Sequence, residues 1–151
     1  MNNTRRTVIK TTSALGTLVA LGLITTQQAH AAVDRAAFEV KSLADAIKAI
    51  GGTVATSDQV SVVSPDIAEN GAVVPVGATS NLPNTTEIYL LVEKNPTPLA
   101  AGFIVPAGTE ASVQTRLKMG QSTNVVAVVK ADGKLFSATK ETKVTLGGCG
   151  G

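Results

Sequence analysis

The sequence predicts a mainly β fold: a sandwich of seven to eight short antiparallel strands, with one amphipathic helix before it and a flexible tail after it. Three observations predict this arrangement. Short apolar and β-branched runs recur, with turn signals about every 8–12 residues. A single apolar stripe with helical spacing precedes them. The chain closes on glycines that flank its one cysteine.

Residues 1–31 are predicted to be an export signal that is removed from the working protein. Their basic start carries Arg5, Arg6 and Lys10 and no acid. An uncharged apolar stretch follows and leads to Ala29-His30-Ala31, which has the form of a cleavage site. Arg5 and Arg6 resemble the pair of a twin-arginine signal, and an ordinary secretory signal is the alternative. A retained anchor is disfavoured, because the apolar stretch is shorter than the ~20 residues that span a membrane.

The composition that remains after cleavage excludes several functions. Removing 31 of 151 residues leaves 120, with ten basic and eleven acidic side chains and a net charge of −1. This balance does not favour nucleic-acid binding, and one Tyr and three Phe offer few stacking platforms. The one histidine, His30, lies in the signal, so no His base or His metal ligand would remain. We expect no cofactor, no metal and no enzymatic activity of the chain's own.

The predicted helix occupies residues 32–52. Its apolar residues recur at spacings of four, three, four and three, which places them on one helix face. These residues are Ala36, Val40, Leu43, Ile47 and Ile50. Asp34 supplies an acid at the expected start, and Gly51-Gly52 is a stop signal.

Residues 53–146 are predicted to be strands and turns. The expected strands lie near 60–63, 72–78, 87–93, 101–105, 110–118, 125–129, 135–139 and 143–146. Asn70-Gly71 is a turn signal, and Asp132-Gly133 indicates a hairpin. Strands of this number and spacing are typical of an immunoglobulin-like antiparallel sandwich.

Residues 147–151 are predicted to be a flexible tail that presents one thiol. The tail reads Gly147-Gly148-Cys149-Gly150-Gly151. Glycines without side chains make it mobile and thin enough to enter a narrow active-site channel. A lone cysteine in an exported protein indicates either a working thiol or a disulfide to another chain. Because no nearby cation or helix start favours the thiolate of Cys149, a partner enzyme would have to activate it.

Several segments resemble one family along the whole chain. The closing Gly-Gly-Cys-Gly-Gly matches, residue for residue, the ending of the SoxY family of sulfur-carrier subunits of the periplasmic Sox thiosulfate-oxidation system. Residues 64–76, SPDIAENGAVVPV, resemble its central segment, with Ser64 where Ala is common. Residues 116–119 and 131–134 and the twin-arginine leader are also similar. Within the central segment, Glu69 and Asn70 are interpreted as turn residues, with partner contact or orientation of the tail as the alternative.

The resemblance implies a periplasmic carrier that serves several enzymes. Cys149 would be the covalent attachment point for sulfur intermediates. A haem enzyme, SoxAX, would couple thiosulfate to it, a hydrolase, SoxB, would release sulfate, and a sulfane dehydrogenase could oxidise the remaining sulfur. The working form would be a heterodimer with SoxZ, with no membrane segment after cleavage.

Two other classes of function stay open at this point. An exported sandwich domain could use Cys149 for an intermolecular disulfide and act as an interaction module, although this leaves the doubled glycines without a reason. A self-sufficient enzyme is the weakest hypothesis, because no phosphate loop, metal cluster or base–nucleophile pair is present in the sequence.

Overall fold

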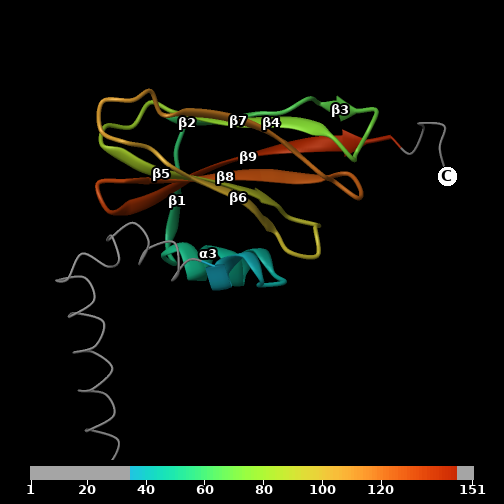
Figure 1. The fold of residues 1–151 in the computed structure, drawn as a ribbon, viewed down its shortest axis with the longest axis horizontal. Coiled ribbons are helices and arrows are strands. Elements are labelled where there is room, and N and C mark those ends of the chain that lie inside the picture. The colour runs from blue at the N-terminus through green and yellow to red at the C-terminus, as the bar shows by residue number, and fades with distance from the viewer. Residues whose placement is uncertain (1–34, 146–151) are drawn as a thin grey trace, which may run out of the picture. The chain divides into compact units, whose positions relative to one another are not determined.

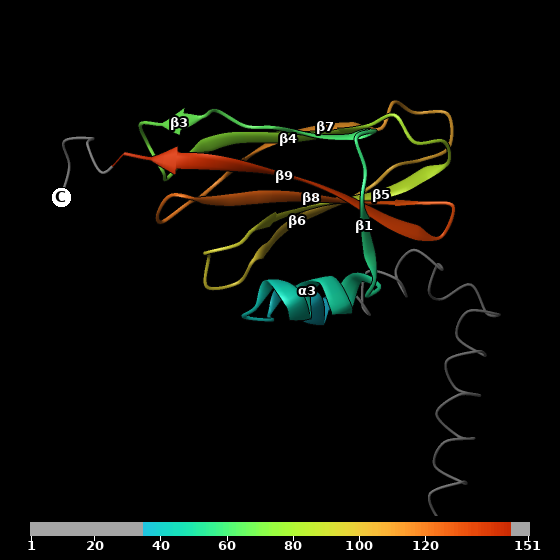
Figure 2. The same cartoon turned by 180° about the vertical axis from the view of Figure 1, so that it is seen from behind.

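Two β-sheets and a short helix make up residues 35–145, the part of the chain that the computed structural model describes (Figure 1). The larger sheet lies in the middle, with the smaller sheet on one side and α3 on the other, as the view from behind also shows (Figure 2). The elements are η1 (Arg35–Phe38), α3 (Leu43–Ile50), β1 (Val54–Thr56), β2 (Val60–Val63), β3 (Ile67–Ala68), β4 (Val74–Ser80), β5 (Thr85–Val92), β6 (Leu99–Ile104), β7 (Ser112–Leu117), β8 (Thr123–Ala131) and β9 (Lys134–Val144). The mainly β sandwich with a preceding helix is therefore confirmed.

The helix is shorter than the predicted 32–52. Ser42 has an extended backbone conformation, and its side chain accepts a hydrogen bond from the Asp45 amide at 3.1 Å, which starts a new helix at Leu43. The preceding residues form only a separate 3₁₀ turn, so Ala37 rather than Ala36 is buried there. Gly51 ends the helix at a φ of 143°, as its stop signal predicts.

The larger sheet has the order β1-β9-β8-β5-β6, with β3 also paired to β9, and the smaller sheet has the order β2-β4-β7. The long strands pair antiparallel, whereas β1 and β3 pair parallel with β9. These two strands of three and two residues bring the number to nine within residues 35–145, against the predicted seven to eight. They are too short to produce a periodic signal in the sequence.

β9 is one strand of 11 residues where the sequence predicts two. The polar run from Lys140 to Thr142 is predicted to separate them. In the structure this run continues the strand: Val125 lies opposite Lys140, and Thr123 lies opposite Thr142. Polar side chains can stay in a strand that faces a core when they find partners, and those partners are described below.

Both faces of the larger sheet are covered, which explains the continuous apolar run in β5. Ile88, Leu90 and Val92 face the smaller sheet, while Tyr89 and Leu91 face α3. The core between the sheets consists of Val60, Ala68, Val74, Val76, Ala78, Ile88, Leu90, Val92, Val105, Leu117, Met119, Val125, Ala127 and Val129. The second cluster, under the helix, contains Ala37, Ala46, Ile50, Tyr89, Leu91, Leu99, Val126, Val128 and Leu135.

Candidate functional site

The predicted site residues lie outside the described part of the chain. This holds for Cys149, for Gly147, Gly148, Gly150 and Gly151, and for Arg5 and Arg6 of the leader. What the structure describes is the point from which the cysteine segment continues: β9 ends at Val144, and Thr145 is exposed. We call residues 142–145, together with residues 64–68 and Ser122 that contact them, the tail base.

One edge of the tail base is held by β3, which belongs to the segment that the sequence analysis singled out. Ile67 is opposite Lys143, and Ala68 is opposite Val144, in parallel register. The Lys143 amide donates to the Asp66 carbonyl at 2.9 Å, and the Thr145 amide donates to the Ala68 carbonyl at 3.1 Å. Backbone pairing therefore continues to the last described residue.

Side chains fasten the same edge. Lys140 donates from Nζ to the Ser64 carbonyl at 2.6 Å and forms an ion pair with Asp66 at 3.1 Å. The Thr142 hydroxyl donates to the Ser64 hydroxyl at 2.9 Å, and both residues are buried. Ser64 directly follows β2 of the smaller sheet, so these contacts tie the two sheets together at the end of the sandwich.

The opposite edge of the tail base is held by Ser122. Its hydroxyl accepts a hydrogen bond from the Val144 amide at 2.9 Å, just beyond the last pair of β8 and β9, Thr123 and Thr142. The Val144 side chain packs against the core between the sheets. The end of β9 is therefore fixed on both edges and by its packing.

The turn that follows β3 agrees with the interpretation of Asn70. Its side-chain oxygen accepts a hydrogen bond from the Ala72 amide at 2.9 Å, an Asx turn, and Glu69 is exposed beside it. The Gly71 carbonyl accepts from the Met119 amide at 2.7 Å. A Cβ on Gly71 would lie 2.3 Å from the Met119 carbonyl oxygen and 2.9 Å from Val144 Cγ1. Glycine is thus required by a close approach next to the tail base.

Sequence reasoning did not find Ser122, Lys140 or Thr142. Their partners are 22, 76 and 78 residues away in the chain, so no local spacing marks them. Ser64 lies in the segment that the sequence analysis singled out, but its contact with Thr142 was not predicted there.

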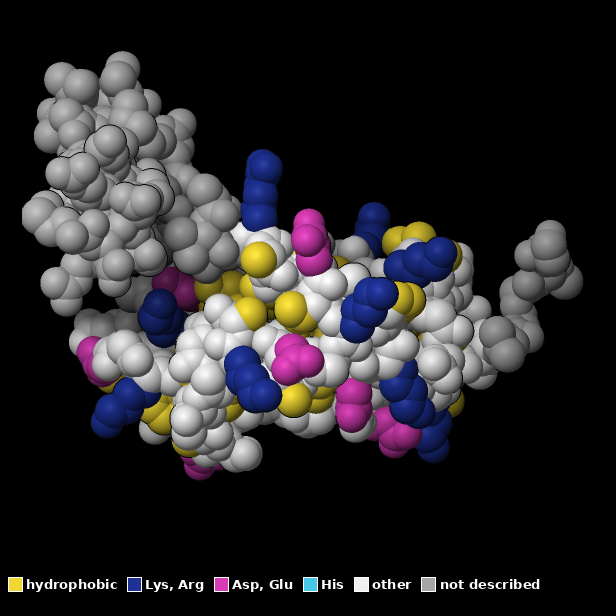
Figure 3. Space-filling model, turned by 90° about the horizontal axis from the view of Figure 1, so that it is seen from below, with side chains coloured by type: hydrophobic (Ala, Val, Ile, Leu, Met, Phe, Trp, Pro, Cys, Tyr) yellow, Lys and Arg dark blue, Asp and Glu magenta, His cyan; other side chains and the backbone are white. Residues whose placement is uncertain are grey.

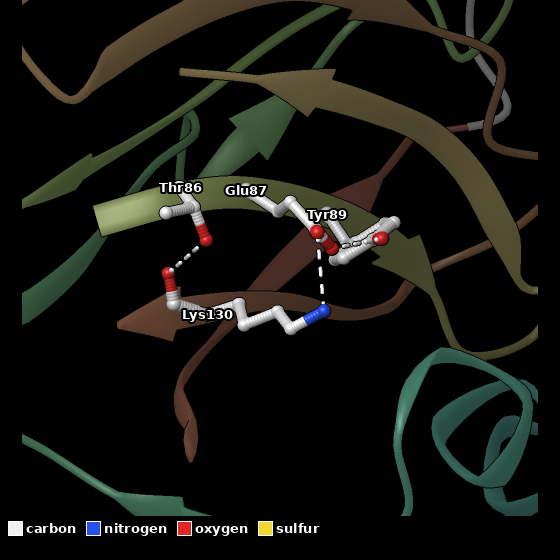
Figure 4. Close-up of polar contacts among 4 residues, drawn as sticks. All are labelled: Thr86, Glu87, Tyr89 and Lys130. Atoms are coloured by element: carbon white, nitrogen blue, oxygen red, sulfur yellow. Dashed lines mark hydrogen bonds and ion pairs between the residues drawn. The ribbon is translucent and has the colours of Figure 1, made fainter. Parts of the chain in front are cut away.

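A second polar cluster lies on the α3 side of the sheet, near the other end of the sandwich (Figure 4). One carboxylate oxygen of Glu87 forms an ion pair with Lys130 at 3.1 Å. The other accepts a hydrogen bond from the Tyr89 hydroxyl at 2.5 Å. Thr86 donates to the Lys130 carbonyl at 3.3 Å. The cluster joins β5 to β8 and satisfies every charge it contains.

A hollow near these strands is also far from the tail base. A pocket of about 500 Å³ lies where β4 ends, β5 begins and the β6–β7 loop passes. β5 begins opposite Ala131 and ends opposite Val125, so this pocket and the end of β9 are at opposite ends of the sandwich. Its lining residues are mostly polar or small, Leu82, Val105 and Pro106 add apolar surface, and Glu110 is the charged one among them.

The surface shows mixed charge. On the face seen from the α3 side, Lys and Arg alternate with Asp and Glu around small hydrophobic patches (Figure 3). Five large hydrophobic side chains are exposed among the described residues: Phe38, Val63, Ile67, Val73 and Ile104. Three of them, Val63, Ile67 and Val73, belong to the stretch around β3.

Within residues 35–145, no group of three or more His, Cys, Asp or Glu side chains could hold a metal ion. The hydrogen bond from Ser42, reinforced by the charge of Lys48, holds the pKa of Asp45 below its usual range, and this carboxylate lies on α3. Of the helices in the described range, none is long and apolar enough to cross a membrane.

These observations define a class: a β-sandwich whose last strand is fixed on both edges and ends five residues before a single cysteine. The model of the family "sulfur oxidation protein SoxY" matches residues 46–149. The chain belongs to the SoxY family.

Solved structures agree with this assignment. The chain is similar to the sulfur carrier protein SoxY from Chlorobium limicola f thiosulfatophilum, with 38% identity over 70% of this chain and 97% of that chain, at a TM-score of 0.64. A superoxide reductase (neelaredoxin) from Ignicoccus hospitalis is 18% identical over 58% of this chain and 80% of that chain, at a TM-score of 0.51, and shows the fold alone. Comparison with curated protein sequences gave no match.

Proposed function

We propose that this chain is a covalent carrier of sulfur intermediates in thiosulfate oxidation, and that Cys149 is the attachment point. Membership of the SoxY family is the observation that carries the proposal, because the family match extends to Cys149. The geometry of the tail base supports a swinging tail: chain pairing continues to Thr145, and the glycines begin two residues later.

The chemistry follows from what a thiol can hold. A haem enzyme, SoxAX, would remove two electrons while the Cys149 thiolate and thiosulfate form an S–S bond, which gives a cysteine S-thiosulfonate. A hydrolase, SoxB, would then add water to the terminal sulfone sulfur, releasing sulfate and two protons and leaving a persulfide anion on Cys149. A sulfane dehydrogenase would oxidise that persulfide further. The carrier supplies attachment and presentation, and its partners supply the redox and hydrolytic chemistry.

The proposed setting is the periplasm, reached by twin-arginine export through Arg5 and Arg6, with SoxZ as a heterodimer partner. Export of a folded chain suits a protein without an internal disulfide, since Cys149 is the one cysteine. The exposed Val63, Ile67 and Val73 support a partner that covers apolar surface. A metal-free and cofactor-free carrier remains part of the proposal.

The test is intact-mass analysis of the chain from thiosulfate-grown cells, before and after reduction. The carrier proposal expects an oxidised-sulfur or polysulfur adduct on Cys149 that reductant removes. A bare thiol, or a protein–protein disulfide as the working form, would instead support the alternative, an exported interaction module.

A further inference from the structure

We propose that Ser64, Asp66, Lys140 and Thr142 are positioning residues that fix where the cysteine tail leaves the sandwich. We call these four residues the tail clamp. The inference rests on the proposed carrier function, because the position of the tail matters only if Cys149 must reach several enzymes. It concerns residues that the carrier chemistry does not use, and two of them, Lys140 and Thr142, were not marked by the sequence.

The contacts of the tail clamp lie at the end of the sandwich where β9 ends. Lys140 and Thr142 lie on the same side of β9 as Ala138 and Val144, which pack against the core between the sheets. From there they reach Ser64, where the chain crosses from the smaller sheet to β3 of the larger one. β3 has only two residues, and so short a strand needs such fastening to stay paired.

The contacts differ in strength. Asp66 is 88% exposed at its side chain, so water screens its ion pair with Lys140 and this contact contributes little. The hydroxyl pair of Thr142 and Ser64 is buried, and removing one partner leaves the other without a hydrogen bond in a site that excludes water. The 2.6 Å bond from Lys140 to the Ser64 carbonyl is charge-assisted. Thr142 and Lys140 are therefore the positions to test.

Loss of the clamp has a calculable effect on the reach of the tail. With the clamp intact, four residue steps separate Thr145 from Cys149. If β3 detaches, the Val144–Ser122 hydrogen bond breaks with it and β9 opens back to its last pair with β8, at Thr142, then seven steps separate the fixed chain from Cys149. The root-mean-square span grows with the square root of the number of steps, by about 1.3-fold. The maximum reach grows from ~14 Å to ~24 Å.

The experiment uses distance measurements between two nitroxide labels on the full chain. Cys149 is the one native cysteine, and Gln114→Cys on exposed β7 supplies the second label. The test variant is Lys140→Met with Thr142→Val. The matched conservative variant, Lys140→Arg with Thr142→Ser, keeps the cation and the hydroxyl. Lys130→Met, which breaks the comparable ion pair with Glu87 at the other end of the sandwich, is the control.

We expect the distance distribution to widen by up to about 1.3-fold in the test variant and to stay at the wild-type width in the conservative variant and the control. Thermal unfolding of each protein is measured alongside, and Thr142→Val alone is used if the double variant does not fold. A lower unfolding temperature with an unchanged distance distribution would overturn the proposal, as would equal widening in the control. Because the readout involves no sulfur adduct, a bare Cys149 in the mass experiment would overturn the carrier function and leave this result standing.

Discussion

Gly71→Ala should destabilise the protein sharply, because Gly71 lies against backbone that cannot move away. The added Cβ would meet the Met119 carbonyl oxygen at 2.3 Å and Val144 Cγ1 at 2.9 Å. The Val144 side chain could rotate, but Met119 is held, since its amide donates to the Gly71 carbonyl at 2.7 Å and its side chain is buried. The φ of Gly71 is not in the left-handed region, so the penalty is steric.

The magnitude follows from two effects. Overpacking a close contact costs ~1–3 kcal/mol, and loss of the hydrogen bond between Gly71 and Met119 costs a further ~0.5–1.5 kcal/mol. We therefore expect a loss of about 2–4 kcal/mol in the free energy of unfolding, or about 10–20 °C in Tm for a domain of this size. Since Val144 is the last residue of β9, the tail base should loosen as well.

The assay is urea and thermal unfolding followed by far-ultraviolet circular dichroism, because the chain contains no Trp and a single Tyr. Gly120→Ala is the matched control. Nothing lies within 4 Å of a Cβ at Gly120, and its φ is not positive. That variant should be neutral or more stable by up to about 1 kcal/mol, because alanine restricts the unfolded chain. The reasoning is refuted if Gly71→Ala unfolds like the wild type or if both variants lose the same stability.

Three further changes test other parts of the structure. Cys149→Ser should abolish the sulfur adduct that the intact-mass experiment is expected to detect, while leaving Tm unchanged; a large fall in Tm would show that the cysteine contributes to the fold. Leu90→Ala should cost ~2–5 kcal/mol in urea unfolding, because Leu90 is fully buried between the sheets, and a loss below ~1 kcal/mol would contradict the assigned core. The lowered pKa of Asp45 means that its contribution to stability is present above its ordinary value of 3.8 and disappears as the pH falls through the lowered pKa. Asp45→Asn should therefore be less stable than the wild type at pH 6 and equal to it at strongly acid pH, and an equal difference at both would refute the assignment.

The sequence was sufficient for those elements that local chemistry determines. Asp132-Gly133 predicts a hairpin, and in the structure both residues have positive φ, at 49° and 73°, between Ala131 and Lys134 of β8 and β9. Such a turn matches the twist of two antiparallel strands, which is why the dipeptide is a strong signal. The apolar run of β5 and the Asx turn at Asn70 were predictable for similar reasons.

Elements that depend on distant partners were not predictable. The helical spacing of apolar residues continues past Ser42, so the sequence pattern does not show that a helix begins there. The Ser42 side chain caps the helix, and this cap determines that the helix begins at Leu43. The polar run at Lys140 looks like a strand break until Ser64 and Asp66 are known to face it. β3 pairs parallel with a strand more than 70 residues later, and two residues carry no periodic pattern. The tail base could not be predicted either, because its contacts join residues far apart in the chain. The cysteine beyond it was nevertheless the clearest feature of the sequence.

The end of β9 reconciles two opposite requirements of the proposed carrier. A thiol that visits several enzymes needs a mobile segment, whereas local opening at a strand end spreads inward unless contacts stop it. Val144 packs on the core between the sheets, so fraying past Thr145 would expose apolar surface as well as break hydrogen bonds. Pairing with β3 on one edge and the hydrogen bond from Val144 to Ser122 on the other make it costly to detach Val144 from the sheet. The fixed part of the described chain therefore reaches Thr145, and under the proposed carrier function the central segment of the sequence would gain a role by holding it there.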